Sequence, residues 1–458
     1  MTIPDAHPAT AGPLSRKTMI LYALPHVTDA VMTLPMALFI PAFYAGERGL
    51  PLAGVGAMIS VSRIFDVLTD PLIGALSDRW HSPWGRRKPW LVMGTPIILL
   101  ATWMLFVPPA NVSLRYLMLW ASLLSIGYSL FDLPYKAWGA ELSTGYRERS
   151  RIAAWREGFG AAGQFLFLVV LIVLGNAGHQ GGNDEMRAIA LMVVISLPPL
   201  VAVMLWKVPE RPPENLTGDA LVGWSAWISL FKNRAFLRTM MAIILFGAGL
   251  MIQATLHKLV LTHVIGRPAL FAPLILGETV ASLAAMPLWL KLSDRIGKHR
   301  AVTLASLWVG VWSLPLPWVG AGDIELYGTL IALRGSSFAA IFFLSNSIAA
   351  DVIDQDTLDT GKQRTGLFFA LWGMAIKLAV ALGVLMGTGF PALFGFNPTA
   401  ASHTPASIAA LMHIYGWLPG LIMLLAFPLL WNFPIDEAYH RHLRTRIEAR
   451  RSSKPTFE

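Results

Sequence analysis

The stretch "RIFDVLTDP", residues 63–71, places Arg63, Asp66 and Asp70 inside a long apolar segment. On an α-helix, at about 100° per residue, these positions fall within about 60° of one another and share one face. A charged side chain inside a bilayer costs roughly 2.5–3.5 kcal/mol, so this face has to find partners on other helices. We expect an ion or substrate path. The alternative is a static ion-pair network that fixes helix packing, although such networks are a poor source of stability.

The composition supports a membrane location for this segment. The chain has 458 residues, of which 55% are hydrophobic and 14% charged. Soluble proteins carry about a quarter charged residues, so a set of soluble domains is excluded and a polytopic membrane protein is predicted. The absence of cysteine excludes disulfides, thiolate metal sites and thiol catalysis. No phosphate-binding lysine loop and no G-x-S-x-G motif occurs, and we expect neither an enzyme nor a cofactor.

Apolar stretches of about 20 residues, long enough to cross a bilayer as helices, recur along the chain. They predict an all-α membrane protein with twelve transmembrane helices. The predicted spans are 18–45, 52–77, 90–109, 112–140, 153–176, 187–206, 236–263, 269–291, 301–320, 325–350, 365–391 and 405–432.

The basic residues predict the orientation of these spans. Of the 36 lysines and arginines, 26 fall in the two tails and the loops on the same side, and four fall in the opposite loops. The positive-inside rule then places both termini in the cytoplasm. The net charge of +9 therefore indicates cytoplasmic loops near the membrane, and no nucleic-acid partner is expected.

The tetrapeptide "LSDR" occurs twice, at 76–79 and 292–295, each time followed by a basic cluster. Each copy ends the second span of a six-span half, a pattern that resembles the major facilitator superfamily. The predicted organisation is an N-terminal half, a cytoplasmic linker rich in proline and charge, a C-terminal half and a basic tail, over residues 1–206, 207–235, 236–435 and 436–458. We expect a gating network that breaks and re-forms as the halves rock, formed by Arg63, Asp78, Arg79, Arg86, Asp294 and Arg295.

A closer resemblance covers nearly the whole chain. "RIFDVLTDPLIGALSDRWHSPWGRRKPW" (63–90), "FDLPY" (131–135) and "RIAAWREGF" (151–159) resemble the span-two, span-four and span-five motifs of the glycoside–pentoside–hexuronide:cation symporters, the melibiose permease family. "DVIDQDTLDTGKQRTG" (351–366) resembles the stretch before span eleven, and Lys377 stands where that family keeps a membrane lysine.

The resemblance implies two sites. A monovalent cation, Na⁺ or H⁺, would be held by Asp66, Thr69, Asp70, Ser129 and Asp132. The same resemblance implies that Asp29, Asp132 and Arg156 contact a sugar. We add Lys136, Trp372 and Lys377 as further candidate substrate-binding residues, with plain helix packing as the alternative for Trp372. Asp132 would touch both ligands, which gives a direct route to coupling.

Some positions depart from the melibiose permease, since Thr28, Lys136 and Trp372 replace residues that serve its sugar. The three basic groups Lys136, Arg156 and Lys377 predict an anionic solute such as a uronide. The alternative for Lys136 is that it pairs with Asp132 and never meets the solute. We expect Glu278 and Arg334 to pair with each other or to line the cavity, and the eleven histidines to have packing or interfacial roles.

The predicted function is uptake of a sugar or sugar-like solute, coupled to Na⁺ or H⁺ by alternating access. A lysophospholipid or other amphiphile carried by the same fold is the first alternative, and a sensor that no longer transports is the second. The expected location is a bacterial inner membrane, and the expected working unit is a monomer in the lipid bilayer.

Overall fold

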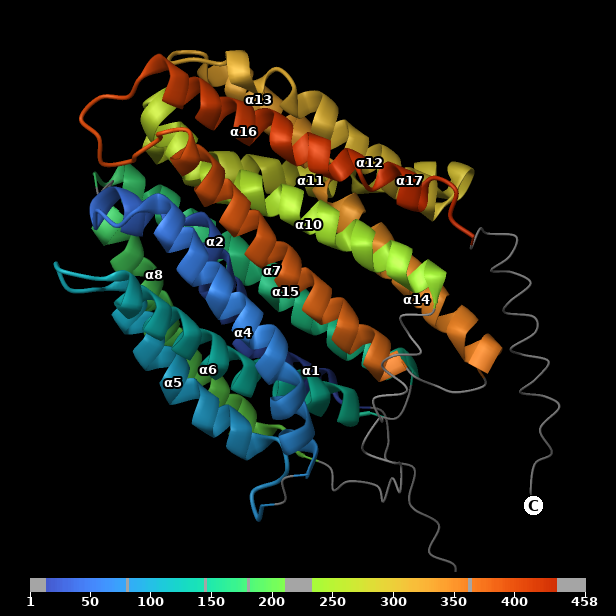
Figure 1. Cartoon of the computed structure of the whole chain (residues 1–458). Coiled ribbons are helices and arrows are strands. Elements are labelled where there is room, and N and C mark those ends of the chain that lie inside the picture. The colour runs from blue at the N-terminus through green and yellow to red at the C-terminus, as the bar shows by residue number, and fades with distance from the viewer. Residues whose placement is uncertain are drawn as a thin grey trace, which may run out of the picture.

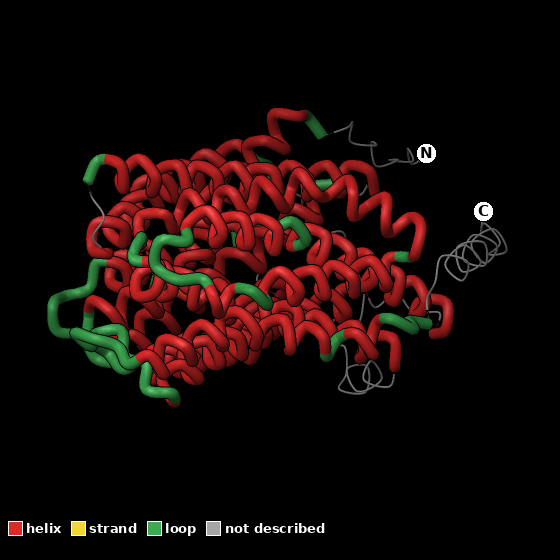
Figure 2. Tube along the Cα trace, turned by 90° about the horizontal axis from the view of Figure 1, so that it is seen from above, coloured by secondary structure: helices red, strands yellow, loops and turns green. Residues whose placement is uncertain are grey.

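The structure is a computed structural model that describes residues 14–79, 82–143, 146–178, 182–210, 233–360 and 365–434. These residues form long helices and contain no strand (Figures 1 and 2). Eleven helices in them are long and apolar enough to cross a membrane, and a bent pair at the start of the chain can supply a twelfth. The predicted all-α membrane class is therefore confirmed.

The first predicted span is a broken helix. It consists of α1 (Arg16–Ala23), a 3-10 turn (Leu24–Thr28), α2 (Asp29–Leu38), the short α3 (Ile40–Ala42) and a π turn (Phe43–Glu47), and it bends by 44° after Leu38. Pro25, Pro35 and Pro41 lie at or near the interruptions. Proline lacks an amide hydrogen and its ring crowds the preceding turn, which explains why one continuous helix does not form here.

The other helices of the first half are continuous. They are α4 (Leu52–Arg79), α5 (Lys88–Phe106), α6 (Leu114–Glu141), α7 (Tyr146–Asn176) and α8 (Gly182–Lys207). Glycine allows close approach between them, as expected where lipid gives helices no hydrophobic reason to associate. A Cβ added to Gly163 of α7 would lie 1.9 Å from the Val27 carbonyl oxygen, so only glycine fits at this crossing.

The second half begins with α10 (Arg234–Val260), which continues into a π turn (Leu261–Ile265). The later helices are α11 (Phe271–Ile296), α12 (Lys298–Ser313), α13 (Ile324–Gly335), α14 (Phe338–Thr360), α15 (Thr365–Leu393), α16 (Pro405–Leu424) and α17 (Phe427–Leu430). Short 3-10 turns lie before α11 and after α12. Helices α13 and α14 together occupy the predicted tenth span, with a break of two residues between them.

The two halves meet along α4 and α15, which pack against each other through much of their length (Figure 1). Helix α10 adds contacts to α2, and α11 contacts α7. The predicted linker, 207–235, lies mostly outside the described residues, although α8 includes Lys207 and α10 includes Arg234. The predicted tail, 436–458, lies entirely outside them.

Candidate functional site

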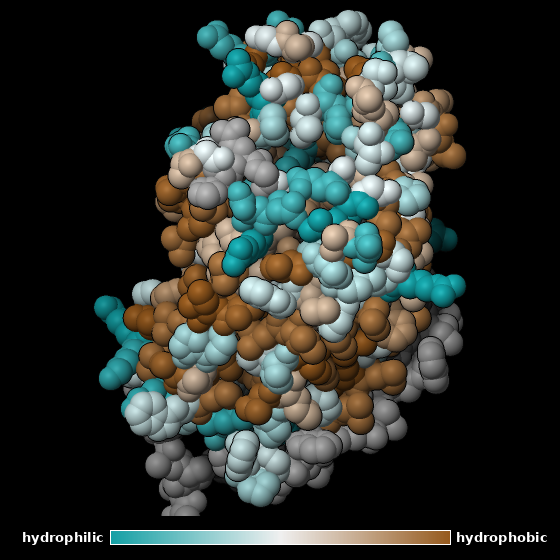
Figure 3. Space-filling model, turned by 90° about the vertical axis from the view of Figure 1, so that its left-hand side faces the viewer, coloured by the Kyte–Doolittle hydropathy of each residue, from teal (hydrophilic) through white to brown (hydrophobic). Residues whose placement is uncertain are grey.

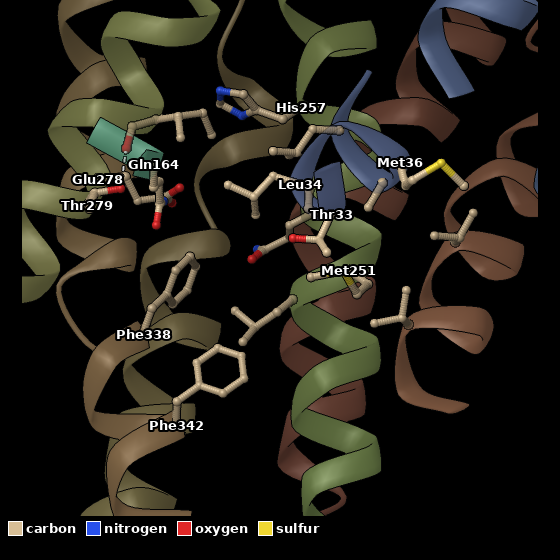
Figure 4. Close-up of a pocket in the computed structure, with 18 of the residues that line it drawn as sticks. Thr33, Leu34, Met36, Gln164, Met251, His257, Glu278, Thr279, Phe338 and Phe342 are labelled. Atoms are coloured by element: carbon tan, nitrogen blue, oxygen red, sulfur yellow. Dashed lines mark hydrogen bonds between the residues drawn. The ribbon is translucent and has the colours of Figure 1, made fainter. Parts of the chain in front are cut away.

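A cavity of about 530 Å³ lies between the halves (Figure 4). Its walls come from α2, α4 and α7 of the first half and from α10, α11, α13, α14 and α15 of the second. Most of the lining is apolar, and Phe338 and Phe342 follow one another along α14. The polar lining residues are Thr33, Arg63, Gln164, Gln253, His257, Glu278, Thr279, Ser282, Arg334 and Lys377. The cavity is thus an apolar chamber with a few separate polar groups, an arrangement typical of small-molecule sites.

Lys377 on the cavity wall pairs with Asp70. The contact joins α15 of the second half to α4 of the first. The other oxygen of Asp70, Oδ1, accepts a hydrogen bond of 2.7 Å from the Ser129 hydroxyl on α6. Asp70 therefore ties three helices together, and two residues predicted for the cation site, Asp70 and Ser129, are in direct contact.

Asp66 lies one helical turn before Asp70. It is 1% exposed, and its Oδ2 is 3.4 Å from Nη1 of Arg63. Among the described residues, its Oδ1 has no partner at full hydrogen-bond geometry, and the Ser125 hydroxyl interacts with this carboxyl group. The Thr69 hydroxyl donates to the Asp66 backbone carbonyl at 3.4 Å. A buried carboxylate with one open oxygen has the chemistry that a small hard cation or a proton requires.

The third predicted carboxylate, Asp132, accepts a 2.6 Å hydrogen bond from Lys136 one turn along α6. Asp132 is 7% exposed, whereas the Lys136 side chain is 47% exposed. Asp66, Asp70 and Asp132 therefore each have their own cationic partner in this state. The pairing of Lys136 with Asp132, which was the alternative to a contact with the solute, is present in this state. A shared cation at the three carboxylates stays a prediction.

The residues predicted to bind sugar divide into two groups. Asp29 accepts a 2.6 Å hydrogen bond from the Tyr128 hydroxyl, and it interacts electrostatically with Asp132 and Lys136. Arg156 pairs with Glu157 at 2.7 Å and interacts with Asp132. None of Asp29, Asp132, Lys136 and Arg156 lines the cavity, whereas Lys377 does.

Trp372 also lies away from the cavity lining. It is 5% exposed, packs beside Ile243 and Ala349, and donates its indole N–H to Asn346 at 2.9 Å. In this state its ring is occupied by helix packing. Stacking of Trp372 on a sugar would require another arrangement of these helices.

The second half contributes a buried network that the sequence indicated only in part. Arg334 Nη2 donates to Glu278 Oε1 at 2.8 Å, and both residues line the cavity. The two residues therefore pair with each other and also line the cavity, so both of the expected alternatives are observed. His257 lies on the cavity wall as well, and its Nδ1 is 2.7 Å from the Tyr415 hydroxyl. The sequence predicted packing or interfacial roles for the histidines and did not place His257 on the cavity wall. Its tyrosine partner is 158 residues away in sequence, so local patterns could not indicate the contact.

A basic cluster lies at one end of the bundle, where α4 ends and α5 begins. Arg86 and Arg87 each donate to Glu141 at the end of α6, at 2.6 Å. Glu210, just after α8, accepts from the backbone amides of Arg86 and Arg87 at 2.6 Å, which places an anion at the start of α5. We call this end, with Glu141 and Glu210, the basic end.

The second half repeats this contact. Lys298 at the start of α12 pairs with Asp351 on α14 at 2.8 Å. In each half, therefore, a basic residue at the start of the third span contacts an acidic residue on the fourth span. This shared contact supports the repeat that the two "LSDR" copies predicted. The side chains of Asp78 and Arg79 lie outside the described residues. The gating roles of Asp294 and Arg295 stay predictions.

The halves also meet at the opposite end of the bundle. Lys258 on α10 pairs with Glu185 on α8, and its ammonium lies 4.6 Å from the centroid of the Phe39 ring. Phe39 in turn contacts Phe271 edge to face, with centroids 4.8 Å apart. On this end of the molecule, polar side chains gather in a patch surrounded by apolar ones (Figure 3). The contacts of Lys258 and Phe39 therefore link the two halves on this side.

Comparison with known proteins gives this architecture a family. A profile described as MFS/sugar transport protein matches residues 21–437. The chain belongs to this family. It is a multi-pass membrane transporter, as the predicted resemblance indicated, and not an enzyme.

Its relatives are described as symporters or carriers. The chain is 24% identical over 457 residues to a protein named "Glucuronide carrier protein homolog" from Escherichia coli, covering 96% of each. It is 23% identical to "Sodium-dependent lysophosphatidylcholine symporter 1" from Homo sapiens, covering 86% of this chain and 78% of that protein. The crystal structure of the nucleoside transporter NupG superposes with a TM-score of 0.66 at 15% identity, over 92% of this chain and 100% of that one, which shows a common fold.

Proposed function

We propose that the protein takes up an anionic, sugar-like solute together with Na⁺ or H⁺. The single observation that carries the proposal is the pair between Asp70 and Lys377, which joins the two halves at the cavity wall. The names of the relatives, which include a glucuronide carrier and a putative glycoside/cation symporter, support the same substrate class.

The pair supplies a route to coupling because a cation and Lys377 would compete for one carboxylate. Asp66, with its open Oδ1, lies one turn from Asp70 on α4. A cation held between these two carboxylates would neutralise Asp70 and release the Lys377 ammonium. A free ammonium at an apolar cavity wall is costly, so an anionic group on the solute would be drawn to it.

Cation and solute then favour each other's binding. The cation exposes the group that the solute needs, and the solute keeps that group away from Asp70. Such coupling is reciprocal by thermodynamic necessity. Loss of this ion pair between α4 and α15 would also loosen the contact between the halves, whose rocking is how transporters of this architecture alternate access.

An amphiphile is the second candidate, and the apolar lining of the cavity favours it. Phe338, Phe342 and neighbouring aliphatic side chains offer little to a bare sugar ring. They suit a glycoside that carries an apolar group, or a lipid-like tail as in the relative named for lysophosphatidylcholine. An aryl glucuronide combines the anionic group, the sugar and an apolar body, and is our preferred probe.

We further propose that both termini lie in the cytoplasm, that the membrane is a bacterial inner membrane, and that one chain suffices for transport. The positive-inside asymmetry and the clustering of Arg86, Arg87 and Lys298 at the basic end support the orientation. The relatives from Escherichia coli support the membrane.

The test is uptake of 4-nitrophenyl β-D-glucuronide into proteoliposomes under an imposed Na⁺ or H⁺ gradient. We expect accumulation above the outside concentration with one of the two gradients, and loss of that accumulation in Asp70→Asn. Uptake that neither gradient changes would contradict symport. Uptake of lysophosphatidylcholine but of no glucuronide would favour the second candidate.

A further inference from the structure

The cavity wall formed by α10 carries two buried polar atoms without partners. Gln253 donates its amide N–H to the Ser313 hydroxyl at 3.0 Å, and its Oε1 has no hydrogen-bond partner among the described residues. His257, one turn further along α10, likewise has no described partner for Nε2. Gln253 is 2% exposed, His257 is 1% exposed, and both line the cavity. Polar atoms this deeply buried rarely lack partners, and a bound ligand would satisfy both of them.

The network behind His257 allows its ring to offer a donor at Nε2. Arginine can only donate, so Arg334 Nη1 donates to the Tyr415 hydroxyl, 3.3 Å away. That hydroxyl can then donate a hydrogen bond to Nδ1 of His257, which is 2.7 Å away. With Nδ1 as acceptor, the ring proton of neutral His257 is on Nε2. Tyr327, 3.2 Å from the same Nδ1, holds the ring in place from the other side.

The α10 wall therefore presents one acceptor and one donor a single helical turn apart. Gln253 Oε1 accepts a hydrogen bond, and His257 Nε2 donates one. Residues four apart on a helix lie side by side, about 5–6 Å between Cβ atoms, so both groups can reach one small ligand. A vicinal diol fits this pair, because one hydroxyl donates and its neighbour accepts.

We propose that Gln253 and His257 form a diol-binding subsite in the second half, which holds the hydroxyls of a sugar ring. This inference rests on the proposed function and adds where the sugar sits. It places the ring against α10, whereas the resemblance to melibiose permease implied the first-half residues Asp29 and Arg156. The anionic group then points to Lys377 on the neighbouring wall, and Phe338 and Phe342 receive the apolar body (Figure 4).

The test compares 4-nitrophenyl β-D-glucuronide with its 2-, 3- and 4-deoxy analogues by isothermal titration calorimetry. Wild-type protein is expected to bind at least one deoxy analogue about two- to tenfold more weakly, since one hydrogen bond is lost. Gln253→Met should weaken binding of the parent glucuronide by the same factor. The variant should also bind the parent and that deoxy analogue equally well, because the hydroxyl no longer has its partner. Thr329→Val, which removes a polar group from the exposed face of α13 outside the cavity lining, is the control and should retain the preference.

A second measurement covers the case in which Gln253→Met does not fold. The chain has no cysteine, so a single Ala254→Cys substitution between the two residues can be labelled selectively. The glucuronide is expected to slow labelling by N-ethylmaleimide severalfold there, and to leave labelling unchanged at Ala162→Cys on the exposed face of α7.

The outcomes separate this inference from the proposed function. The subsite is wrong, and the proposed function stands, if the glucuronide binds and either of two results is found. The first is that Gln253→Met still prefers the parent glucuronide over the deoxy analogue. The second is that the glucuronide does not protect Ala254→Cys from N-ethylmaleimide. If wild-type protein binds none of the glucuronides, the proposed substrate class is wrong and the subsite falls with it.

Discussion

Lys377 of α15 and Asp70 of α4 form an ion pair across the two halves of the molecule, beside the central cavity. Asp70 also accepts from Ser129, so this one carboxylate links the second half to both α4 and α6. A cation that took the place of Lys377 would change the contacts between the halves and the charge of the cavity in a single step.

Replacing Lys377 tests its two proposed roles separately, namely competition with the cation for Asp70 and attraction of the anionic solute. Lys377→Gln is expected to strengthen cation binding at least severalfold, because Asp70 loses its competitor, and to weaken binding of an anionic solute. Thermal unfolding of the purified variant, titrated with Na⁺ and with acid, measures the first effect. Lys298→Gln, which also removes a paired lysine but at the basic end, is the control. An unchanged cation response in Lys377→Gln would show that the lysine does not compete with the ion.

Lys258 and Glu185 pair across the two halves at the end of the bundle opposite the basic end. Glu185→Gln should favour the state open on that side. In an Ala254→Cys background, a membrane-impermeant thiol reagent added to cells should label the cavity several times faster. Arg267→Gln, a charge change at the same end, should leave the rate unchanged. The reversed pair Glu185→Lys with Lys258→Glu should restore slow labelling, and failure to do so would argue against this contact as a gate.

Glu141 holds two arginines, and one of them, Arg87, is 3% exposed. Glu141→Gln is expected to destabilise the protein because it leaves a buried guanidinium with weaker partners. The midpoint of thermal unfolding should fall by several degrees. Glu157→Gln breaks an ion pair whose acid is 66% exposed and should change the midpoint little. Equal effects of the two substitutions would contradict the role assigned to burial.

The crossing of α7 with the first span depends on Gly163. Gly163→Ala would bring a Cβ to 1.9 Å from the Val27 carbonyl oxygen, so the helices must separate. We expect little folded protein in detergent extracts, as judged by size-exclusion chromatography. Gly158→Ala on the same helix meets nothing within 4 Å and is the matched control. Normal yields of Gly163→Ala would mean that α7 and the first span are packed less closely than described.

The sequence predicted the features that local rules control. Arg63, Asp66 and Asp70 had to face other helices because lipid cannot solvate them, and that argument needs only their spacing. The broken first span could have been predicted as well, since Pro25, Pro35 and Pro41 were visible in the sequence.

The partners of these groups could not be predicted in the same way. Lys377 is 307 residues from Asp70, and no periodicity encodes which distant helix packs against α4. The same holds for His257 and Tyr415, whose contact places a histidine on the cavity wall. The family resemblance grouped Asp70 with Ser129, which are in direct contact, but of the predicted sugar-binding residues Lys377 alone lines the cavity in this state.

Equilibrium binding of 4-nitrophenyl β-D-glucuronide, measured by calorimetry with and without Na⁺ and at several pH values, tests the central claim most directly. The account predicts that one of the two cations raises the affinity of wild-type protein about tenfold or more, and that Asp70→Asn removes this dependence. A glucuronide affinity that neither cation changes in wild-type protein, or a cation effect that survives in Asp70→Asn, would contradict it.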